Sequence, residues 1–319
     1  MGPNTQLKIA IFGVGAMGSL FGSQLNALAD VTLFGNWPEQ LAVLKRDGLI
    51  VTNPEGGQTH HALRVTNQLV ELPPADVALI LVKSHQTARA AAEAAQILRP
   101  SGLAITLQNG LGNLETLTAA VGPERAALGI TAQGATVVAP GQVCHAGNGL
   151  THLALAPGLE EPLQQVADLF NQAGLETTLV DNPQSLVWGK LAINAGINPL
   201  TALLEVPNGA LVEQESWRQV MAAAAREVAQ VAAAQGIRLP FGDVAARTAE
   251  VSQATAANRS SMLQDVSRAA PTEIDAITGA VVRFGRLFGI PTPVNETLLG
   301  LIKDKEAGRL SLGSSALGI

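Results

Sequence analysis

The sequence is poor in cysteine, and Cys144 is its only one. A single thiol excludes an internal disulfide and fits a reducing compartment, so we expect a cytoplasmic protein. The neighbouring His145 would suit a nucleophilic pair, but an isolated cysteine is far more often a small strand residue. We therefore expect Cys144 to lie in a strand and to have no catalytic role.

Charged residues are also scarce. They make up 14% of the 319 residues, the formal net charge is −6, and the chain has no block of basic residues. This composition argues against binding to nucleic acid. The 47% of hydrophobic residues argues against disorder and indicates a globular protein with enough chain for two domains.

The chain lacks an uncharged apolar run of the roughly 20 residues needed to span a bilayer. The richest stretch, residues 221–236, contains Arg226 and Glu227 and is typical of an amphipathic helix. The N-terminus has no signal-peptide pattern. The five histidines lack the spacing of metal ligands. We expect neither a membrane partner nor a bound metal.

Glycines gather near the N-terminus, where Gly13, Gly15 and Gly18 follow the apolar run of residues 7–12. A strand, a G-x-G-x-x-G motif and a helix in this order form the dinucleotide-binding fingerprint. In that fingerprint the first glycine makes the tight turn, the second admits the pyrophosphate and the third lets helix and strand pack closely. The helix N-terminus then offers N–H groups to the phosphates. The alternative interpretation is a purely structural glycine turn.

Strands and helices alternate through the first half of the chain. Apolar runs predict strands at 31–34, 77–82 and 103–107, with a helix at 86–98 between the last two. This alternation indicates a doubly wound parallel sheet. We expect short antiparallel hairpins at the end of that sheet, followed by a helix and a last strand. These later elements are predicted at 135–139, 142–145, 151–156, 163–174 and 176–180.

After Asp181 the pattern is only helical, with helices predicted at 183–204, 214–236, 241–258 and 272–289. The fold class is therefore α/β, with a Rossmann-type doubly wound parallel sheet followed by an all-helical C-terminal domain. We expect residues 1–181 to bind a dinucleotide and residues 182–319 to form the substrate and catalytic domain. The tail from 312 to 319 is predicted to be frayed.

Polar residues follow two of the predicted parallel strands, where ligands bind in open α/β sheets. Lys83 follows the third strand and suits a phosphate, a ribose or a carboxylate, with a solvated lysine as the alternative. Asn109 follows the next strand and suits a ribose or a substrate. Its alternative role is that of an Asn-Gly turn residue.

Lys190, Asn194 and Asn198 are spaced at i, i+4 and i+8, so a helix places them on one face. Their neighbours are apolar, and an ammonium and two amides among apolar groups are costly unless they are paired. The spacing favours a ligand-facing stripe and leaves a solvated stripe as the alternative. Pro199 removes one hydrogen bond and would kink this helix.

Thr272 and Asp275 are spaced as in a capping box at the start of the last predicted helix. Capping explains these two residues and leaves Glu273 unexplained. Glu273 would then either face a ligand or serve as a favourable charge in the first turn.

Taken together, these motifs resemble the ketopantoate reductase (2-dehydropantoate 2-reductase) family over nearly the whole chain. Each motif is weak alone, but their order along one chain is specific. The residues that carry the resemblance are Gly13, Gly15, Gly18, Lys83, Asn109, Gly110, Asn148, Gly149, Lys190, Asn194, 198–202, 207–209, 260–265 and 272–275.

The resemblance implies NADP-dependent reduction of ketopantoate to pantoate by hydride transfer, in pantothenate and coenzyme A biosynthesis. It implies that Lys190 is the general acid and that Glu273 orients it or binds a substrate hydroxyl. The implied substrate contacts are Asn109, Asn194, Asn198, Ser261 and Asn208, with a local turn role as the alternative for Asn208. The implied cofactor contacts are Gly13, Gly15, Ala16, Met17, Gly18, Asn36, Lys83, Gln86 and Asn109.

One position departs from the family. Its members usually place an arginine after the second strand to pair with the 2′-phosphate of NADP, and this chain has Asn36 there. An amide supplies no charge, so NAD stays open and Asn36→Arg is predicted to raise the preference for NADPH. Reduction of another small 2-keto acid and an NAD(P) sensor without turnover are the alternative functions. A homodimer is also left open.

Overall fold

The computed structural model describes residues 6–310, and its chain divides into two compact units. The first unit holds the residues up to Gln108 together with 113–183, and the second holds 109–112 together with the residues from Gln184 onward. The short loop 109–112 therefore belongs with the second unit, although its flanking segments belong to the first. The predicted frayed tail, 312–319, lies outside the described residues.

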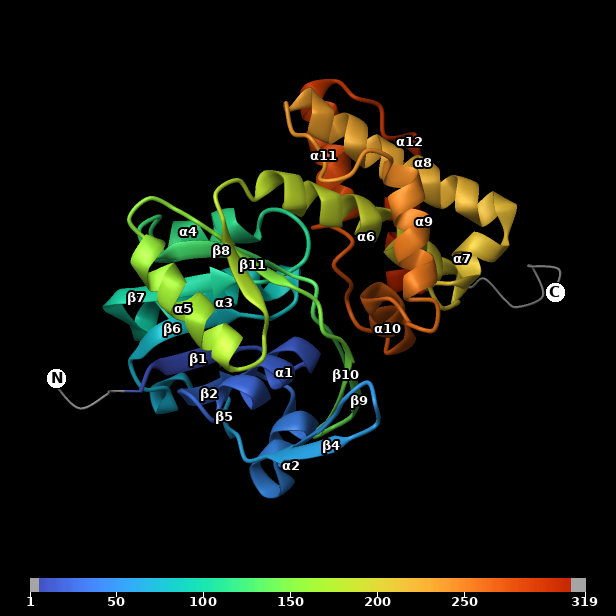
Figure 1. Ribbon diagram of the computed structural model, residues 1–319. Coiled ribbons are helices and arrows are strands. Elements are labelled where there is room, and N and C mark those ends of the chain that lie inside the picture. The colour runs from blue at the N-terminus through green and yellow to red at the C-terminus, as the bar shows by residue number, and fades with distance from the viewer. Residues whose placement is uncertain (1–5, 311–319) are drawn as a thin grey trace. The chain divides into compact units, whose positions relative to one another are not determined.

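The first unit is built on an eight-stranded sheet with the order β12-β11-β8-β7-β6-β1-β2-β5 (Figure 1). From β5 to β8 all neighbouring strands run parallel, whereas β11 is antiparallel to β8 and parallel to β12. The strands are β1 (Lys8–Phe12), β2 (Asp30–Phe34), β5 (Arg64–Thr66), β6 (Ala75–Ile80), β7 (Leu98–Thr106), β8 (Ala126–Thr131), β11 (Thr151–Ala154) and β12 (Thr177–Val180).

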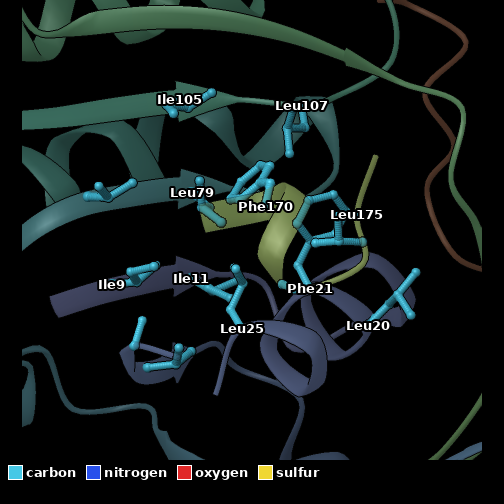
Figure 2. Close-up of a cluster of buried hydrophobic side chains, with 14 of the residues drawn as sticks. Ile9, Ile11, Leu20, Phe21, Leu25, Leu79, Ile105, Leu107, Phe170 and Leu175 are labelled. Atoms are coloured by element: carbon cyan, nitrogen blue, oxygen red, sulfur yellow. The ribbon is translucent and has the colours of Figure 1, made fainter. Parts of the chain in front are cut away.

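Successive residues of β1 enter two different cores, because side chains alternate across a strand. Ile9 and Ile11 face α1 (Ala16–Leu25) and α5 (Glu160–Gln172), and Figure 2 shows Phe21 and Phe170 packed above them. Ala10 and Phe12 belong to the other core, with α3 (Thr87–Ile97) and α4 (Asn113–Val121). Helices on both faces confirm the predicted doubly wound parallel sheet.

A second, four-stranded sheet has the order β4-β3-β10-β9. It consists of β3 (Leu49–Thr52), β4 (Gln58–His61), β9 (Gly134–Ala139) and β10 (Gln142–Gly147), and α2 (Pro38–Asp47) precedes it in the chain. The prediction that the β9–β10 hairpin ends the main sheet was wrong, because β10 pairs in parallel with β3. Gly141 fixes this pairing, since its N–H donates to Gln40 Oε1 and its carbonyl accepts from Ile50 N, both at 2.8 Å. Cys144 lies half-buried in β10, as expected of a strand residue.

Between residues 184 and 310 the second unit contains helices and turns only. Its longest helix, α6, contains Gly196, where a Cβ atom would lie 2.9 Å from Thr248 Cγ2 and 3.1 Å from Met221 O. The glycine therefore allows α6 to lie close to α8 and α9. The helices are α6 (Gln184–Leu204), α7 (Ala210–Glu213), α8 (Glu215–Ala234), α9 (Val244–Ala254), α10 (Ser261–Ser267), α11 (Thr278–Phe288) and α12 (Pro293–Glu306).

The last two helices differ from the prediction. Helix α11 begins at Thr278 instead of 272, and a further helix that was not predicted, α12, follows it. Pro293 opens α12, where a missing N–H costs nothing. The buried Glu227 carboxylate accepts from Val294 N at 2.8 Å and from Asn295 N at 2.9 Å, which satisfies the first turn. None of the helices in residues 6–310 is long and apolar enough to cross a membrane.

Candidate functional site

The glycine motif follows β1, at the edge where β1, β2 and β6 all end. Gly13 has φ +132°, and a Cβ atom there would lie 2.7 Å from Leu81 O. A Cβ atom on Gly18 would lie 1.8 Å from Gly13 O. Only glycine fits at either position, because the turn and the helix–strand contact leave no room for a side chain.

Gly15 differs from the other two glycines. It is the N-cap of α1, and a Cβ atom there would meet no other atom within 4 Å. No side chain caps this helix start, so its first N–H groups have no side-chain acceptor. An open glycine at a helix N-terminus fits a pyrophosphate. Ala16 and Met17 follow, half-buried, and the Met17 side chain packs against the apolar core of the first unit.

Lys83 is half-buried after β6, just before a short 3-10 turn that ends at Gln86. Gln108 secures this segment, since its Nε2 donates to Val82 O at 2.7 Å and to Thr87 Oγ1 at 2.8 Å. Thr87 Oγ1 in turn lies 2.8 Å from Ser84 O. Gln108 and Thr87 were not predicted to be positioning residues. The available signal was a polar side chain directly after a buried strand end.

Asn36 lies two residues beyond β2 and is exposed. Its side chain contacts the guanidinium of Arg89, from the first turn of α3. Arg89 was not among the predicted cofactor residues. Its position in the first turn of a helix that follows a parallel strand was the signal that could have identified it.

In the second unit, α6 carries Lys190, Asn194 and Asn198 on one face, as their spacing predicted. Lys190 and Asn194 are half-buried, and Asn198 is 7% exposed. Pro199 is accommodated within the helix. In the turn that contains the proline, the Thr201 hydroxyl lies 3.0 Å from the carbonyl oxygens of both Ile197 and Asn198 and can donate to either of them.

Lys190 is electrostatically coupled to Glu273. Burial lowers the pKa of Lys190 to about 8, and the negative charge of Glu273 opposes this shift. Averaged over all its atoms, Lys190 is only half-buried. The lowered pKa therefore reflects the burial of the Nζ group more than that of the methylene chain. Glu273 is 6% exposed. An ammonium with a pKa near neutrality, beside a buried carboxylate, can donate a proton at physiological pH.

Glu273 lies in a turn before α11 and not in the first turn of a helix. The predicted capping box is absent, because Thr272 Oγ1 accepts from Ile274 N at 3.1 Å and Asp275 pairs with Lys303. The turn forms because Ala276 N and Ile277 N donate to Glu273 O at 3.1 and 3.0 Å. Backbone hydrogen bonds thus fix the position from which the Glu273 side chain extends.

The loop 109–112 packs against the same turn. Leu111 N donates to Ala276 O at 2.9 Å. Gly110 has φ +84°, and a Cβ atom there would lie 2.5 Å from Ala276 O, so only glycine permits this approach. Asn109 and Glu273 are therefore carried by two segments in direct contact.

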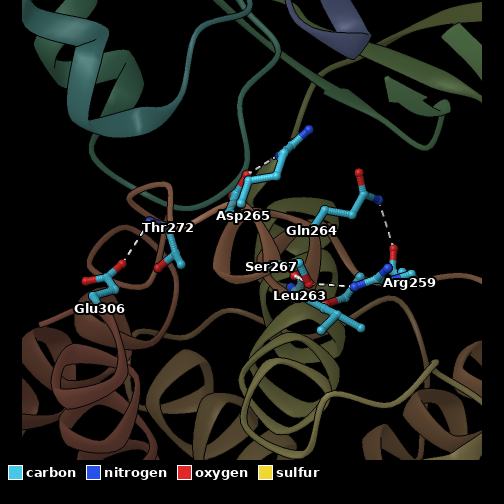
Figure 3. A network of polar contacts seen from close by, with 9 residues as sticks. Arg259, Leu263, Gln264, Asp265, Ser267, Thr272 and Glu306 are labelled. Atoms are coloured by element: carbon cyan, nitrogen blue, oxygen red, sulfur yellow. Dashed lines mark hydrogen bonds and ion pairs between the residues drawn. The ribbon is translucent and has the colours of Figure 1, made fainter. Parts of the chain in front are cut away.

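Ser261 is the first residue of α10 and is half-buried. The preceding Ser260 caps the helix by accepting from Leu263 N at 3.1 Å, and its Oγ lies 2.7 Å from Thr201 Oγ1 of α6. This contact anchors the start of α10 to the helix that carries Lys190. In Figure 3, Gln264 donates to Arg259 O at 3.0 Å and Arg259 donates to Ser267 Oγ at 2.5 Å, which braces the rest of α10.

Asn208 is held by local contacts. Its Nδ2 donates to Thr255 Oγ1 at 2.9 Å, its N–H donates to Asn258 O at 2.9 Å, and its carbonyl accepts from Ser252 Oγ at 2.7 Å. These contacts join the α6–α7 connection to α9 and fit the local role given as its alternative. A substrate contact by Asn208 stays a prediction.

Known proteins are similar to this chain over most of its length. Residues 9–158 match the family described as ketopantoate reductase PanE/ApbA, and residues 182–306 match its C-terminal domain. A 2-dehydropantoate 2-reductase of Halobacterium salinarum is 38% identical over 304 residues, which cover 93% of this chain and 98% of that protein.

Two solved structures are also similar. One is a PanE/ApbA family ketopantoate reductase from Ralstonia eutropha JMP134, with a TM-score of 0.86 and 30% identity over 95% of this chain and 99% of that one. The other is D-mandelate dehydrogenase with NADH and anilino(oxo)acetate, with a TM-score of 0.88 and 28% identity over the same shares. The chain belongs to the ketopantoate reductase family of oxidoreductases.

Proposed function

We propose that this protein reduces 2-dehydropantoate to pantoate with NADPH, a reaction of pantothenate and coenzyme A biosynthesis. The observation that carries the proposal is Lys190, whose pKa is lowered to about 8 beside the buried Glu273. Relatives at 35–38% identity over nearly the whole chain are 2-dehydropantoate 2-reductases, which supports this choice of substrate.

The edge of the first unit formed by Gly13–Gly18, Lys83 and Gln86 would hold the dinucleotide. Gly15 leaves room for the pyrophosphate, and the N–H groups of α1 and the Lys83 ammonium suit its negative charge. A bound reduced nicotinamide supplies the hydride for the ketone carbon. Ala16 and Met17 shape the same turn, and Asn36 lies where the adenosine ribose is expected.

Lys190 acts as the general acid. Its ammonium stabilises the negative charge that develops on the ketone oxygen and donates the proton that completes the alcohol. Glu273 keeps Lys190 protonated and orients it, because its charge opposes the loss of the proton. The paired charges also reduce the cost of burying an ammonium in this part of the protein.

The polar side chains around Lys190 position the substrate. Asn194 and Asn198 share its face of α6 and would bind hydroxyl or carbonyl groups of the keto acid. Ser261, at the start of α10, would bind the carboxylate. Asn109 would bridge cofactor and substrate, and Asn208 would support the site through the α6–α7 connection.

A second candidate is the reduction of a different small 2-keto acid. It is favoured by the similarity to D-mandelate dehydrogenase, a structure solved with NADH. The Lys190–Glu273 pair serves either substrate, since it acts on the keto group and not on the rest of the molecule.

Initial rates with the purified protein separate these candidates. The substrates are 2-dehydropantoate and 2-oxo-2-phenylacetate, the keto acid that corresponds to mandelate, each with NADPH and NADH. We expect the highest kcat/KM for 2-dehydropantoate with NADPH. Preferential turnover of 2-oxo-2-phenylacetate would favour the second candidate, and nucleotide binding without turnover of either would indicate a sensor.

A further inference from the structure

Asn36 and Arg89 form a contact at the surface of the first unit. The Asn36 side-chain oxygen accepts from Arg89 Nη1 at 2.9 Å and from Nη2 at 3.3 Å, while its amide nitrogen donates to Gly35 O at 3.2 Å. These partners fix the orientation of the amide, because the opposite one would leave a donor facing donors. Asn36 therefore holds the guanidinium group of Arg89 in place.

This contact spans the end of the strand that leads into the glycine motif. β1 pairs in parallel with β2 on one side and β6 on the other, with Phe12 opposite Phe34 and Ile80. Asn36 follows β2, and Arg89 lies on the helix that follows β6. The position about 20 residues after a G-x-G-x-x-G motif is where the ribose 2′ substituent of a dinucleotide is recognised.

The charge of Arg89 is unusual for its place in the helix. It is the third residue of α3, and no acidic residue accompanies it in the first turn. A cation at a helix N-terminus is disfavoured by the helix dipole, so an anion bound there would relieve the repulsion. Arg89 makes no ion pair within residues 6–310, although its charge acts on Glu93 one turn later, where it partly offsets a rise in pKa caused by burial.

We propose that Arg89, oriented by Asn36, is the cation that selects the 2′-phosphate of NADPH. This inference rests on the proposed NADPH-dependent function. The charge that the family's arginine supplies from the end of β2 would here come from α3, with the amide of Asn36 as its support. A guanidinium group binds a phosphate through two charge-assisted hydrogen bonds but gains far less from the neutral ribose hydroxyl of NADH.

Two small nucleotides isolate this interaction from catalysis. Adenosine 2′,5′-bisphosphate carries the 2′-phosphate and adenosine 5′-monophosphate lacks it, so titration calorimetry of the full chain with each gives the discrimination directly. We expect Arg89→Ala to weaken binding of the bisphosphate about 10- to 100-fold and to change binding of the monophosphate less than about twofold. Arg89→Lys should retain part of the preference, because it retains the charge.

Two further variants sharpen the test. Asn36→Asp places a carboxylate beside Arg89, so binding of the bisphosphate should fall while Arg89 itself is intact. Arg64→Ala is the matched control: Arg64 is exposed, pairs with Asp30 at 2.9 Å and lies at the start of β5, opposite Thr32 and away from the end of β2 that Asn36 follows. It should leave both affinities unchanged. Circular dichroism checks that each variant folds. If Arg89→Ala does not fold, the binding data for Arg89→Lys and Asn36→Asp provide the test of the role of Arg89.

The outcomes separate the two proposals. If the unmodified protein prefers the bisphosphate but Arg89→Ala leaves that preference unchanged, or weakens both nucleotides equally, the role of Arg89 is overturned and the NADPH preference stands. If the unmodified protein binds the monophosphate as tightly as the bisphosphate, the NADPH preference and the role of Arg89 fall together. Turnover of 2-dehydropantoate is measured separately and does not affect either reading of the binding data.

Discussion

Burial lowers the pKa of Lys190 to about 8, and Glu273, on a turn more than eighty residues further along the chain, acts in the opposite direction. The balance leaves an ammonium that is still mostly protonated at neutral pH but ready to lose its proton. The turn that carries Glu273 also contacts the loop 109–112, because Leu111 N donates to Ala276 O. An acid, its carboxylate partner and a candidate substrate amide are thus assembled within one unit.

Replacing Lys190 tests its role as the acid. Lys190→Met keeps the length of the side chain and removes the charge, so kcat should fall by about 10²- to 10⁴-fold. Nucleotide affinity should change little, because the residues proposed to bind the cofactor are untouched. Stopped-flow kinetics and nucleotide titration measure the two effects.

The matched control is Lys305→Met, since the Lys305 side chain is 8% exposed and pairs with Glu205 at 2.7 Å. It removes a buried lysine from the same unit and should keep kcat. If Lys190→Met retained normal turnover, or lost only nucleotide affinity, the role of the lysine as the acid would be wrong.

The pH profile of the reduction should follow Lys190. Below pH 8 the lysine is protonated and kcat/KM should be level, whereas above pH 8 it should fall about tenfold per pH unit as the acid is lost. Pantoate oxidation needs the neutral amine as a base, so its kcat/KM should rise across the same range. Initial rates in both directions between pH 6 and 10 measure this.

Glu273→Gln should displace that profile. Removing the negative charge removes the influence that raises the Lys190 pKa, so the alkaline fall in kcat/KM should move to lower pH. The glutamine keeps the shape of the side chain, which separates the charge effect from a packing effect. A fall in activity with the profile unmoved would mean that Glu273 acts on the substrate and not on Lys190.

Two glycines of the motif should respond in opposite ways. Gly15→Ala adds a Cβ atom in open space, so stability should be unchanged while nucleotide affinity drops at least about tenfold, since the new methyl group occupies the place of the pyrophosphate. Gly18→Ala adds a Cβ atom 1.8 Å from Gly13 O, which should cost about 3 kcal/mol of stability. Thermal denaturation and nucleotide titration distinguish the two. Loss of stability in Gly15→Ala would contradict the open cradle.

Glu227 should matter for stability alone. Glu227→Leu would leave the N–H groups of Val294 and Asn295 without their acceptor, at a cost of about 3 kcal/mol, while the Asn295 amide would keep only its bond to Ala224 O. The exposed Glu250 on α9 provides the control, and Glu250→Gln should leave the thermal midpoint unchanged. Scanning calorimetry measures both variants. A Glu227→Leu protein with an unchanged midpoint would show that water replaces the carboxylate at the start of α12.

Much of the first unit was predictable because its signals are local. The apolar run before Gly13 and the motif itself fix a strand, a turn and a helix within about twenty residues. The stripe of Lys190, Asn194 and Asn198 follows from helical periodicity in the same way. Their roles toward cofactor and substrate stay predictions that the experiments above address.

The missed features depend on partners far away in the sequence. The pairing of β10 with β3 joins segments about ninety residues apart, so no local pattern reveals that the hairpin leaves the main sheet. The start of α11 was misplaced because Thr272 and Asp275 have capping spacing, yet Asp275 pairs with Lys303 and the turn is closed by backbone bonds. Helix α12 was not predicted, because a proline that can end one helix can also begin the next, as Pro293 does.

Local periodicity and glycine spacing specify the doubly wound sheet, the helical second half and the face that carries Lys190, so these features can be read from the chain alone. Which charges act on one another depends on the packing of elements distant in the sequence. Through that packing the charge of Glu273 acts on Lys190, and Arg89 contacts Asn36. Electrostatic effects depend on distance in space and on burial, and the spacing of residues along the chain gives neither of these quantities.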